Sequence, residues 1–451
     1  MTERVVVVGG DAAGMSAASL LKRRRGDDVE VIAIERGSYT SYSACGIPYW
    51  IAGDVGSAEE LVARSPEEHR RRGIDLRMHT EVVEIDLNAG HVVARSVQGA
   101  DRIGFDQLVL ATGAVPVRPD LPGIDAGGVL GVQTLDDGAA VLAALTSDVR
   151  RVVVVGAGYI GVEISEAVVR RDLDVTVLDA AAEPMTTLDP DMGALVHTAM
   201  EGLGIDVRPQ TVVSAIETDH EGRARAVVTD AQTFPADLVI LGIGVRPNTA
   251  LAHTAGLPLG DAGGLVTDDA MRVGGHDAVW AGGDCVEVLH RVSGRLVHVP
   301  LGTHANKHGV VIGTNLSGGA ATFPGVVGTA VSRVCDLEIA RTGLTTTDAE
   351  RAGYDVVSAV IESTTRAGYF PGTNPLTVKM LAARGSGRLL GVQIVGREDS
   401  GKRIDAAAVA LWNAMSVQEV MGLDLAYAPP FSPVWDPVLV AARKVSQRLA
   451  G

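Results

Sequence analysis

The chain has 451 residues, 46% of them hydrophobic, and its 39 Lys and Arg against 55 Asp and Glu leave a formal net charge of −16. A chain of this length and apolar content can bury the cores of two to four domains, and its acidic balance excludes a surface built to neutralise nucleic-acid phosphates. No apolar stretch approaches the roughly 20 residues that cross a bilayer, and the cysteines show no metal-binding spacing. We therefore expect a cytoplasmic protein with no metal site, no membrane contact and no nucleic-acid partner.

The first 35 residues predict a βαβ unit. An apolar run at residues 5–8 meets a glycine turn, a segment rich in small residues follows, and a second apolar run ends in Glu35. This order is typical of a parallel sheet that binds a dinucleotide. Gly9 and Gly14 occupy the outer positions of a GxGxxG turn, but Asp11 stands at the middle position. Glu35 is placed to accept hydrogen bonds from a ribose.

Residues 38–50, SYTSYSACGIPYW, follow this strand and contain Cys45. No second cysteine lies close enough in the sequence to pair with it. The segment is a glycine- and serine-rich turn between a strand and a helix, unlike a packing position. We predict that Cys45 is reactive, whereas Cys285 and Cys335 serve as small hydrophobic residues.

Two later segments complete the first unit. Residues 105–119 and 277–288 are each a β run that closes on small residues, which lets the backbone approach a flat or phosphorylated ligand closely. Asp284, near the end of the second run, is placed to accept from a polyol hydroxyl such as that of a flavin. We therefore expect a discontinuous domain, residues 1–120 and 250–323.

Residues 150–179 repeat the βαβ pattern and satisfy GxGxxG completely, with Gly156, Gly158 and Gly161. The glycines permit the tight turn, the approach of a pyrophosphate and close helix packing, and the amino terminus of the helix favours the anion. Asp179 ends the second strand, where a carboxylate accepts from a ribose 2′-hydroxyl and repels a 2′-phosphate. No arginine follows in DAAAEPM, so NADH is favoured over NADPH.

After about residue 324, apolar and polar residues alternate as in antiparallel strands. Helical segments are predicted at residues 403–415 and 416–423, and the proline-rich residues 426–438 are expected to contact a partner. The predicted fold is therefore α/β, with two Rossmann-like dinucleotide-binding domains and a C-terminal α+β dimerisation domain. The second Rossmann-like domain, residues 121–249, is inserted in the first, and residues 324–451 form the dimerisation domain.

The two nucleotide-binding units, together with LATGAVP, WAGGDC and SYSACGIPYW, resemble the FAD-dependent pyridine nucleotide-disulfide oxidoreductases over essentially the whole chain. Tryptophan stands where relatives with a CxxxxC pair carry the second cysteine, so the chain looks like the single-cysteine subgroup, closest to coenzyme A-disulfide reductases. NADH oxidases and peroxidases usually carry histidine in the first glycine loop, where Asp11, Ala12 and Ala13 stand here. The resemblance implies that electrons pass from NADH through FAD to Cys45, which forms a mixed disulfide with CoA.

The resemblance also implies roles for individual residues. Cys45 would be catalytic, with a thiol pKa lowered by a helix amino terminus near it. Tyr369 and Tyr427 would be catalytic across a homodimer, each reaching the active site of the other subunit. Arg23 and Ser41 would bind the substrate, Arg23 through the 3′-phosphate of CoA, and His304 and His308 would lie on a helix beside the flavin. The expected cofactor-binding residues are Gly9, Gly10, Ala13, Gly14, Glu35, Arg36, Ser43, Val83, Ala111, Thr112, Gly113, Gly283 and Asp284 for FAD, and Gly156, Gly158, Tyr159, Ile160, Gly161, Asp179 and Gly244 for NADH.

Other functions stay open at this point. The same Cys45 would serve an NADH oxidase through a sulfenic acid, or a persulfide or polysulfide reductase. A flavoprotein that uses its cofactors for partner docking or sensing is a non-redox alternative, against which the Cys45 turn argues. The leading hypothesis is reduction of CoA disulfide or a similar low-molecular-weight disulfide, with CoA bound covalently to Cys45 in part of the cycle.

Overall fold

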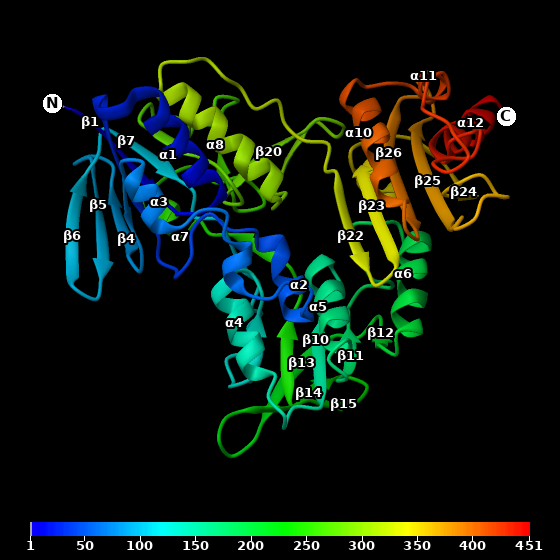
Figure 1. The fold of residues 1–451 in the computed structure, drawn as a ribbon, viewed down its shortest axis with the longest axis horizontal. Coiled ribbons are helices and arrows are strands. Elements are labelled where there is room, and N and C mark those ends of the chain that lie inside the picture. The colour runs from blue at the N-terminus through cyan, green and yellow to red at the C-terminus, as the bar shows by residue number, and fades with distance from the viewer. Residues whose placement is uncertain (1) are drawn as a thin grey trace.

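The computed structural model describes residues 2–451 and begins with a five-stranded parallel sheet in the order β19-β7-β1-β2-β3. The valines of β1 are buried on both faces, as expected for a central parallel strand covered by helices. Helices α1 and α8 pack against each other on this sheet, at the N-terminal end of the molecule (Figure 1). The strands are β1 (Glu3–Val8), β2 (Val29–Ile34), β3 (Ile74–Arg77), β7 (Gln107–Leu110) and β19 (Val279–Ala281), and the helices are α1 (Ala12–Arg25) and α8 (Gly302–Leu316).

Smaller elements surround this first unit. An antiparallel meander joins β4, β5 and β6, and β20 pairs with β18 and β21. Three short helices follow the loops between strands. Their bounds are β4 (Glu81–Asp86), β5 (His91–Ser96), β6 (Gly99–Gly104), β18 (Leu265–Val266), β20 (Val286–His290), β21 (Arg295–Val297), α2 (Ile47–Ala52), α3 (Pro66–Arg71) and α7 (Ala250–Thr254).

The second unit has the same kind of sheet, five parallel strands in the order β12-β11-β10-β16-β9. In the sequence, these strands lie between β7 and β19 of the first unit. Two antiparallel strands, β8 (Ala114–Pro116) and β17 (Val245–Pro247), pair where the chain leaves and re-enters the first unit. The remaining elements are β9 (Val129–Gly131), β10 (Arg151–Val155), β11 (Asp174–Leu178), β12 (Asp206–Arg208), β13 (Val213–Thr218), β14 (Ala224–Thr229), β15 (Thr233–Pro235), β16 (Leu238–Leu241), α4 (Leu135–Ala144), α5 (Tyr159–Val169) and α6 (Pro190–Gly202).

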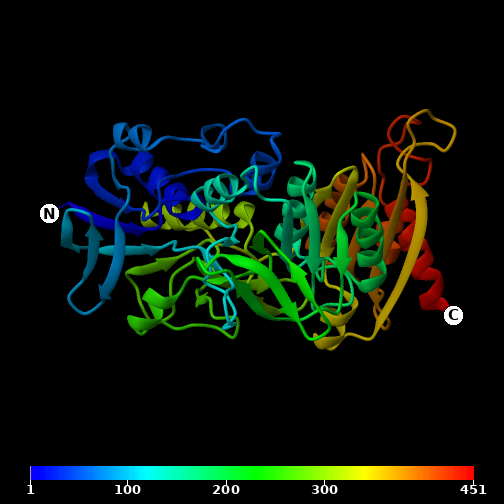
Figure 2. The ribbon, with the colours of Figure 1, turned by 90° about the horizontal axis from the view of Figure 1, so that it is seen from below.

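The third lobe is an antiparallel sheet in the order β22-β23-β26-β25-β24, covered by helices near the C-terminus, as Figures 1 and 2 show. The two predicted helices form as α10 and α11. Helix α12, which begins at Pro437 behind an Asp436 cap, was not predicted, because its proline-rich approach concealed it. The bounds are β22 (Ala330–Val334), β23 (Leu337–Gly343), β24 (Val356–Thr364), β25 (Pro375–Ala383), β26 (Leu389–Gly396), α9 (Thr346–Arg351), α10 (Ile404–Trp412), α11 (Val417–Met421) and α12 (Pro437–Ala450).

The three-part α/β architecture predicted from the sequence is therefore confirmed, while the domain boundaries stay a prediction. The first unit and the third lobe each have an apolar core, and the core of the second unit extends to Val334, Ile339 and Val395 of the third lobe. The core of the second unit also includes Ile47 and Ile51 of α2, so α2 packs on the inserted unit although it belongs to the first part of the chain. Within residues 2–451, no helix combines the length and apolarity needed to cross a membrane.

Candidate active site

The first glycine loop has the geometry of a nucleotide-binding turn. Gly9 adopts φ +111°, and a Cβ on Gly14 would lie 2.0 Å from the carbonyl oxygen of Gly9. No side chain fits at either position. The Glu35 carboxylate accepts hydrogen bonds from the backbone N–H of Gly10 and of Gly37, both at 2.7 Å. Glu35 therefore holds the turn, and its remaining lone pairs are available to a ribose.

Asp11, the departure from GxGxxG, connects this turn to the cysteine segment. Its carboxylate accepts from the backbone N–H of Tyr42 at 3.1 Å, and the Thr40 hydroxyl donates to the carbonyl of Gly10. Burial raises the pKa of Asp11 to about 6, the hydrogen bond from Tyr42 opposes that rise, and Glu35 adds to it. The segment leading to Cys45 is thus hydrogen-bonded to the first glycine loop.

Cys45 lies in a 3₁₀ turn, Ala44–Gly46, directly before α2. The backbone N–H of Ser43 donates to the carbonyl of Leu61 at 2.9 Å, and that of Gly46 donates to Ser43 at 2.9 Å. Beyond the turn, α2 packs against α4 and α5 of the second unit. Cys45 therefore lies at the junction of the two units, with its side chain exposed.

The predicted lowering of the Cys45 pKa is wrong for the polypeptide itself. Partial desolvation by the surrounding chain raises the pKa of the Cys45 thiol, and the carboxylates of Glu163 and Asp284 raise this pKa further. A backbone hydrogen bond opposes the rise but is the smallest of these contributions. The following helix, α2, has only six residues, which provides a weak dipole.

Glu163 is a member of this site that sequence reasoning missed. It lies on α5 of the second unit, and the Ser332 hydroxyl donates to its carboxylate at 2.7 Å. Burial raises the pKa of Glu163 to about 7, and this carboxylate also raises the pKa values of Cys45 and Tyr49. Glu163 stands two residues after Gly161, the last glycine of the second turn. A carboxylate at this place in a largely apolar helix was the sequence feature that could have indicated its membership of the site.

The carboxyl ends of β7 and β19 bring two more predicted segments together. These strands are parallel neighbours, so Ala111, Thr112 and Gly113 lie beside Gly283 and Asp284 at one edge of the sheet. The N–H of Gly283 donates to Nδ1 of His308 at 3.1 Å. Burial raises the pKa of Asp284 to about 6, and Asp11 contributes to that rise. The carboxylate of Asp284 therefore lies in the electrostatic field of Asp11.

The second glycine loop reproduces the first. Gly156 adopts φ +97°, and a Cβ on Gly161 would lie 1.9 Å from the carbonyl oxygen of Gly156. Asp179 accepts from the N–H of Ala157 at 2.5 Å and of Ala181 at 2.7 Å, as Glu35 does in the first unit. The hydroxyl of Tyr159, at the start of α5, is buried without a hydrogen-bond partner. Two open glycine turns and this orphaned hydroxyl fit two dinucleotides, one in each unit.

Other predicted residues have more varied positions. Gly158 caps α5 and Ile160 follows within its first turn, while Gly10 and Ala13 stand at the start of α1. Arg36 and Ser43 are exposed, Val83 on β4 is 36% exposed, and Gly244 adopts φ +90° with open space around it. Arg23 is exposed near the end of α1, and Ser41 adopts φ +50°.

Tyr369 and Tyr427 lie together on the third lobe. Their side chains are 78% and 47% exposed, and the pKa of Tyr427 is raised, first by desolvation and then by the neighbouring Tyr369. Within residues 2–451, no hydrogen bond joins either tyrosine to the Cys45 segment. The single chain therefore does not bring the tyrosines to Cys45.

The other cysteines fit structural roles. Cys285 is fully buried, and its thiol donates to the carbonyl of Gly282 at 3.3 Å. Cys335 stands in the β22–β23 turn, where desolvation, followed by Glu166, raises its pKa to about 11. On α8, His308 is buried and its ring packs edge-on against Phe323, with 4.2 Å between ring centroids. His304 and His308 thus belong to a packed helical face.

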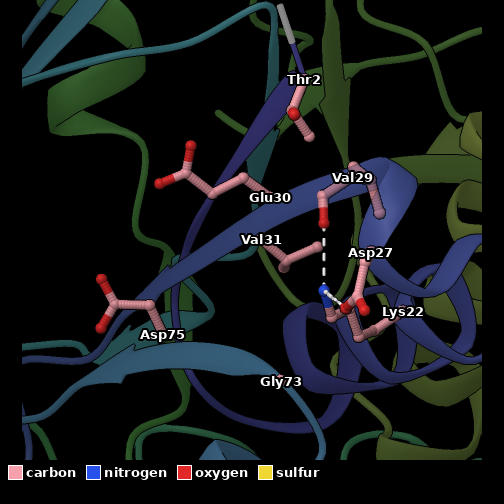
Figure 3. Close-up of a pocket in the computed structure, with 8 residues that line it drawn as sticks. All are labelled: Thr2, Lys22, Asp27, Val29, Glu30, Val31, Gly73 and Asp75. Carbon is pink, nitrogen blue, oxygen red and sulfur yellow. Dashed lines mark hydrogen bonds and ion pairs between the residues drawn. The ribbon is translucent and has the colours of Figure 1, made fainter.

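Two surface pockets lie near these elements. One, of about 320 Å³, contains no predicted site residue; Lys22 within it donates to the carbonyl of Val29 at 3.1 Å and pairs with Asp27 (Figure 3). The other, of about 370 Å³, adjoins the cysteine helix through Tyr49 and includes Arg333 and Lys402. The second pocket is therefore the one connected to the candidate site.

Known proteins match nearly the whole chain. The family model described as pyridine nucleotide-disulphide oxidoreductase matches residues 3–309, and its dimerisation domain matches residues 329–437. The chain is 40% identical over 443 residues, 97% of each chain, to a CoA-dependent NAD(P)H sulfur oxidoreductase of Pyrococcus abyssi.

Two solved structures have similar folds. The NAD-dependent persulfide reductase from A. fulgidus has a TM-score of 0.96 and 35% identity, covering 99% of this chain and 84% of that one. The reduced Bacillus anthracis CoADR-RHD has a TM-score of 0.95 and 31% identity, covering 100% of this chain and 81% of that one. Since both family models match in chain order and the relatives match across both units, the chain belongs to the pyridine nucleotide-disulphide oxidoreductase family.

Proposed function

We propose that this chain reduces CoA disulfide or a similar low-molecular-weight disulfide at Cys45, using NADH. The observation that carries the proposal is an exposed cysteine hydrogen-bonded, through its own segment, to the first glycine loop. The family implies FAD and NAD(P)H as cofactors. When bound, FAD supplies the two-electron relay between nicotinamide and sulfur.

The two glycine turns divide cofactor binding in this proposal. The first turn, with Glu35 and the edge formed by residues 111–113 and 283–284, holds FAD. The second turn and Asp179 hold NADH. The junction of the two units, where Cys45, Glu163 and Asp284 share one electrostatic environment, is where the nicotinamide, flavin and sulfur would meet.

The lone cysteine determines the proposed chemistry. Cys45, as thiolate, attacks one sulfur of the substrate RSSR, so a Cys45–SR bond forms, the S–S bond of the substrate breaks and RS⁻ leaves. Two electrons from NADH then cleave the mixed disulfide, which releases a second RS⁻ and regenerates the Cys45 thiolate. The sum is RSSR + NADH + H⁺ → 2 RSH + NAD⁺. CoA held covalently on Cys45 is the mixed-disulfide form of this cycle.

Two features support a substrate with the charge of CoA. Arg23 is exposed and forms no ion pair within residues 2–451, so its guanidinium is available to a phosphate. Ser41 lies four residues before Cys45 and offers a hydroxyl. We therefore propose Arg23 and Ser41 as substrate-binding residues.

The proposed active form is a homodimer in which Tyr369 and Tyr427 reach the Cys45 site of the other subunit. Residues 329–437 match a dimerisation domain. Both tyrosines are exposed, and Phe431, Val434 and Trp435 beside them in the proline-rich segment are 57–75% exposed, an apolar surface suited to a partner. Mixing Cys45→Ser protein with Tyr427→Phe protein tests this: heterodimers with one intact site should recover activity that neither parent has.

The direct experiment measures NADH consumption with and without CoA disulfide. We expect the disulfide to accelerate NADH oxidation, and Cys45→Ser to lower that rate by about 10³-fold or more while FAD stays bound. Cys335→Ser is the matched control and should retain full activity. A Cys45→Ser enzyme with normal turnover would refute the proposal.

Mass spectrometry of the denatured protein examines the covalent state. A reductant-sensitive adduct of the mass of CoA on Cys45 is the expected result. An unmodified Cys45 after incubation with CoA disulfide in the absence of NADH would argue against the mixed disulfide.

Persulfide or polysulfide reduction is the second candidate, favoured by the relatives named above. Cys45, as thiolate, would attack the R-bound sulfur of a persulfide RSSH, so a Cys45–SR bond forms, the S–S bond of the persulfide breaks and HS⁻ leaves. The two functions therefore share one mixed disulfide. Comparing the specificity constants for CoA disulfide and CoA persulfide distinguishes them. Oxygen consumption with NADH alone, at the rate of disulfide turnover, would instead indicate an oxidase.

A further inference from the structure

His69 is a fully buried histidine outside the motifs that define the family. It lies on α3, its side chain is 0% exposed, and its Nε2 lies 2.9 Å from Oγ of Ser41. Its other ring nitrogen, Nδ1, is buried without a hydrogen-bond partner. A polar ring in this position requires an explanation, because burial without full pairing costs free energy.

The contact is made at a strained and well-anchored position. Ser41 adopts φ +50°, a conformation that non-glycine residues rarely take. Its carbonyl accepts from the N–H of Ala63 at 2.8 Å, and a bridge between Tyr42 and Val62 continues the pairing toward Cys45. The Ser41 side chain is therefore held in one place relative to the cysteine turn.

The unpaired Nδ1 decides the tautomer. A buried N–H donor without an acceptor is rarer and costlier than a bare acceptor nitrogen, so the proton belongs on Nε2, which donates to Oγ of Ser41. Burial, followed by Arg64 and Arg72, lowers the pKa of His69 to about 4, and Glu68 opposes this only in part. The ring is therefore neutral, with one tautomer, throughout the neutral pH range.

This tautomer leaves the hydroxyl proton of Ser41 free. Within residues 2–451, the Ser41 hydroxyl has no hydrogen-bond partner besides His69, and the Ser41 side chain is half-buried at the edge of the cysteine segment. With Nε2–H donating to one lone pair of Oγ, the O–H proton of Ser41 stays free for donation to a ligand. An acceptor oxygen, carbonyl or phosphate, is the complementary group.

We propose that His69 is a positioning residue that orients the Ser41 hydroxyl to donate its proton to an acceptor oxygen of the thiol substrate bound at Cys45. The identity of the substrate in this proposal rests on the proposed disulfide or persulfide reduction. The tautomer of His69 does not depend on that function. It adds a specificity element: substrates that present an acceptor oxygen near the reacting sulfur are favoured over those that do not.

The kinetic test compares His69→Phe, which keeps a planar ring but removes both nitrogens, with His69→Gln, which retains an N–H donor. We expect His69→Phe and Ser41→Ala each to raise the KM for the CoA substrate about 10-fold, with kcat within about twofold. The double variant should be no worse than either single variant, and His69→Gln should recover most of the loss. NADH oxidation by an artificial acceptor that bypasses Cys45 should not change in His69→Phe or His69→Gln.

A purely structural role predicts a different result. In that case His69→Phe and His69→Gln would lower kcat and the artificial-acceptor rate together, and Ser41→Ala would not reproduce the effect. A raised KM in Ser41→Ala with an unchanged KM in His69→Phe would also overturn the proposal.

Nitrogen-15 NMR of histidine-labelled holoenzyme gives a readout independent of substrate. The signals that are present in the wild type and absent in His69→Phe belong to His69. They should have the pattern of a neutral ring protonated at Nε2 and should not change across the neutral pH range. A ring protonated at Nδ1 would refute the assignment. If the wild-type enzyme reduced neither CoA disulfide nor CoA persulfide, the proposed function would fail and the proposed substrate contact with it, whereas the tautomer would still be decided by this spectrum.

Discussion

The two nucleotide-binding units use the same turn, and they differ at one position that matters for chemistry. In both, the first glycine has a positive φ, the last glycine touches its carbonyl, and an acid at the end of the second strand accepts from the loop backbone. At the middle position the second unit has Gly158, whereas the first has Asp11. Asp11 accepts from Tyr42 and thereby fixes the segment that carries Cys45. A departure from a binding motif can thus mark where the glycine loop is hydrogen-bonded to a separate segment, here the one that carries Cys45.

The largest expected effect comes from substituting the last glycine of each turn, because the two substitutions should impair the binding of different cofactors. Gly14→Ala should abolish FAD binding, and Gly161→Ala should leave FAD bound but raise the KM for NADH about 100-fold or more, because each added Cβ overlaps a backbone oxygen within about 2 Å. Flavin absorbance and NADH kinetics measure the two outcomes. Gly202→Ala on α6, where an added Cβ meets nothing within 4 Å, is the control and should behave as wild type. Loss of FAD from Gly161→Ala would break the division between the units.

The second unit is also fixed to the third lobe by a buried lysine. Lys379 on β25, 8% exposed, pairs with Asp189 at 2.8 Å and with Asp191 at 2.7 Å. Lys379→Met should destabilise the protein by about 3–5 kcal/mol, since it leaves Asp189 buried without its cation. Thermal unfolding measures this. Lys402→Met removes the exposed pair with Asp405 and should change stability by less than about 1 kcal/mol; equal effects of the two would contradict the assignment.

Asp11 predicts a pH dependence in flavin-free protein. Its folded pKa of about 6 exceeds the ordinary 3.8, so its contribution to stability is fully present below about pH 4 and is lost as pH rises through 6. Asp11→Asn should therefore stabilise the protein at pH 8 by roughly 2–3 kcal/mol and flatten the profile between about pH 4 and 6, measured by thermal unfolding. Asp27→Asn, at an exposed carboxylate, should leave the profile unchanged. A destabilised Asp11→Asn at pH 8 would show that the Tyr42 hydrogen bond outweighs desolvation.

The smallest expected effect concerns cofactor preference. Asp179→Ala should raise the KM for NADH about 10-fold, because an acceptor for the ribose and for two backbone donors is lost, and should affect the KM for NADPH less. The ratio of the two specificity constants measures the change. Asp206→Ala, exposed on β12 of the same unit, should leave the ratio unaltered. A wild-type enzyme that prefers NADPH would contradict the role given to Asp179.

Sequence reasoning succeeded where the signal was local. The glycine turns, the acids at the strand ends and the alternating strands of the third lobe each occupy a short window with its own periodicity or composition, whereas the role of Cys45 stays a prediction. It missed α12 because prolines precede it, and it missed Glu163 because that residue becomes part of the site only when α5 meets α2. The raised pKa of Cys45 could not be predicted for the same reason: Glu163 and Asp284 are far from it in the chain.

By itself, the sequence determined the two dinucleotide units and their order, and it singled out Cys45 as the proposed reactive residue, because turn sterics and strand alternation are properties of neighbouring residues. Only the tertiary structure decided the surroundings of that sulfur: Asp11 fixing its segment, Glu163 and Asp284 setting its field, and His69 orienting Ser41. Electrostatic fields and hydrogen bonds act through space, and the groups that exert them here come from separate elements. The position of Cys45 could therefore be read from the sequence, while the folding of distant segments around it established its electrostatic surroundings.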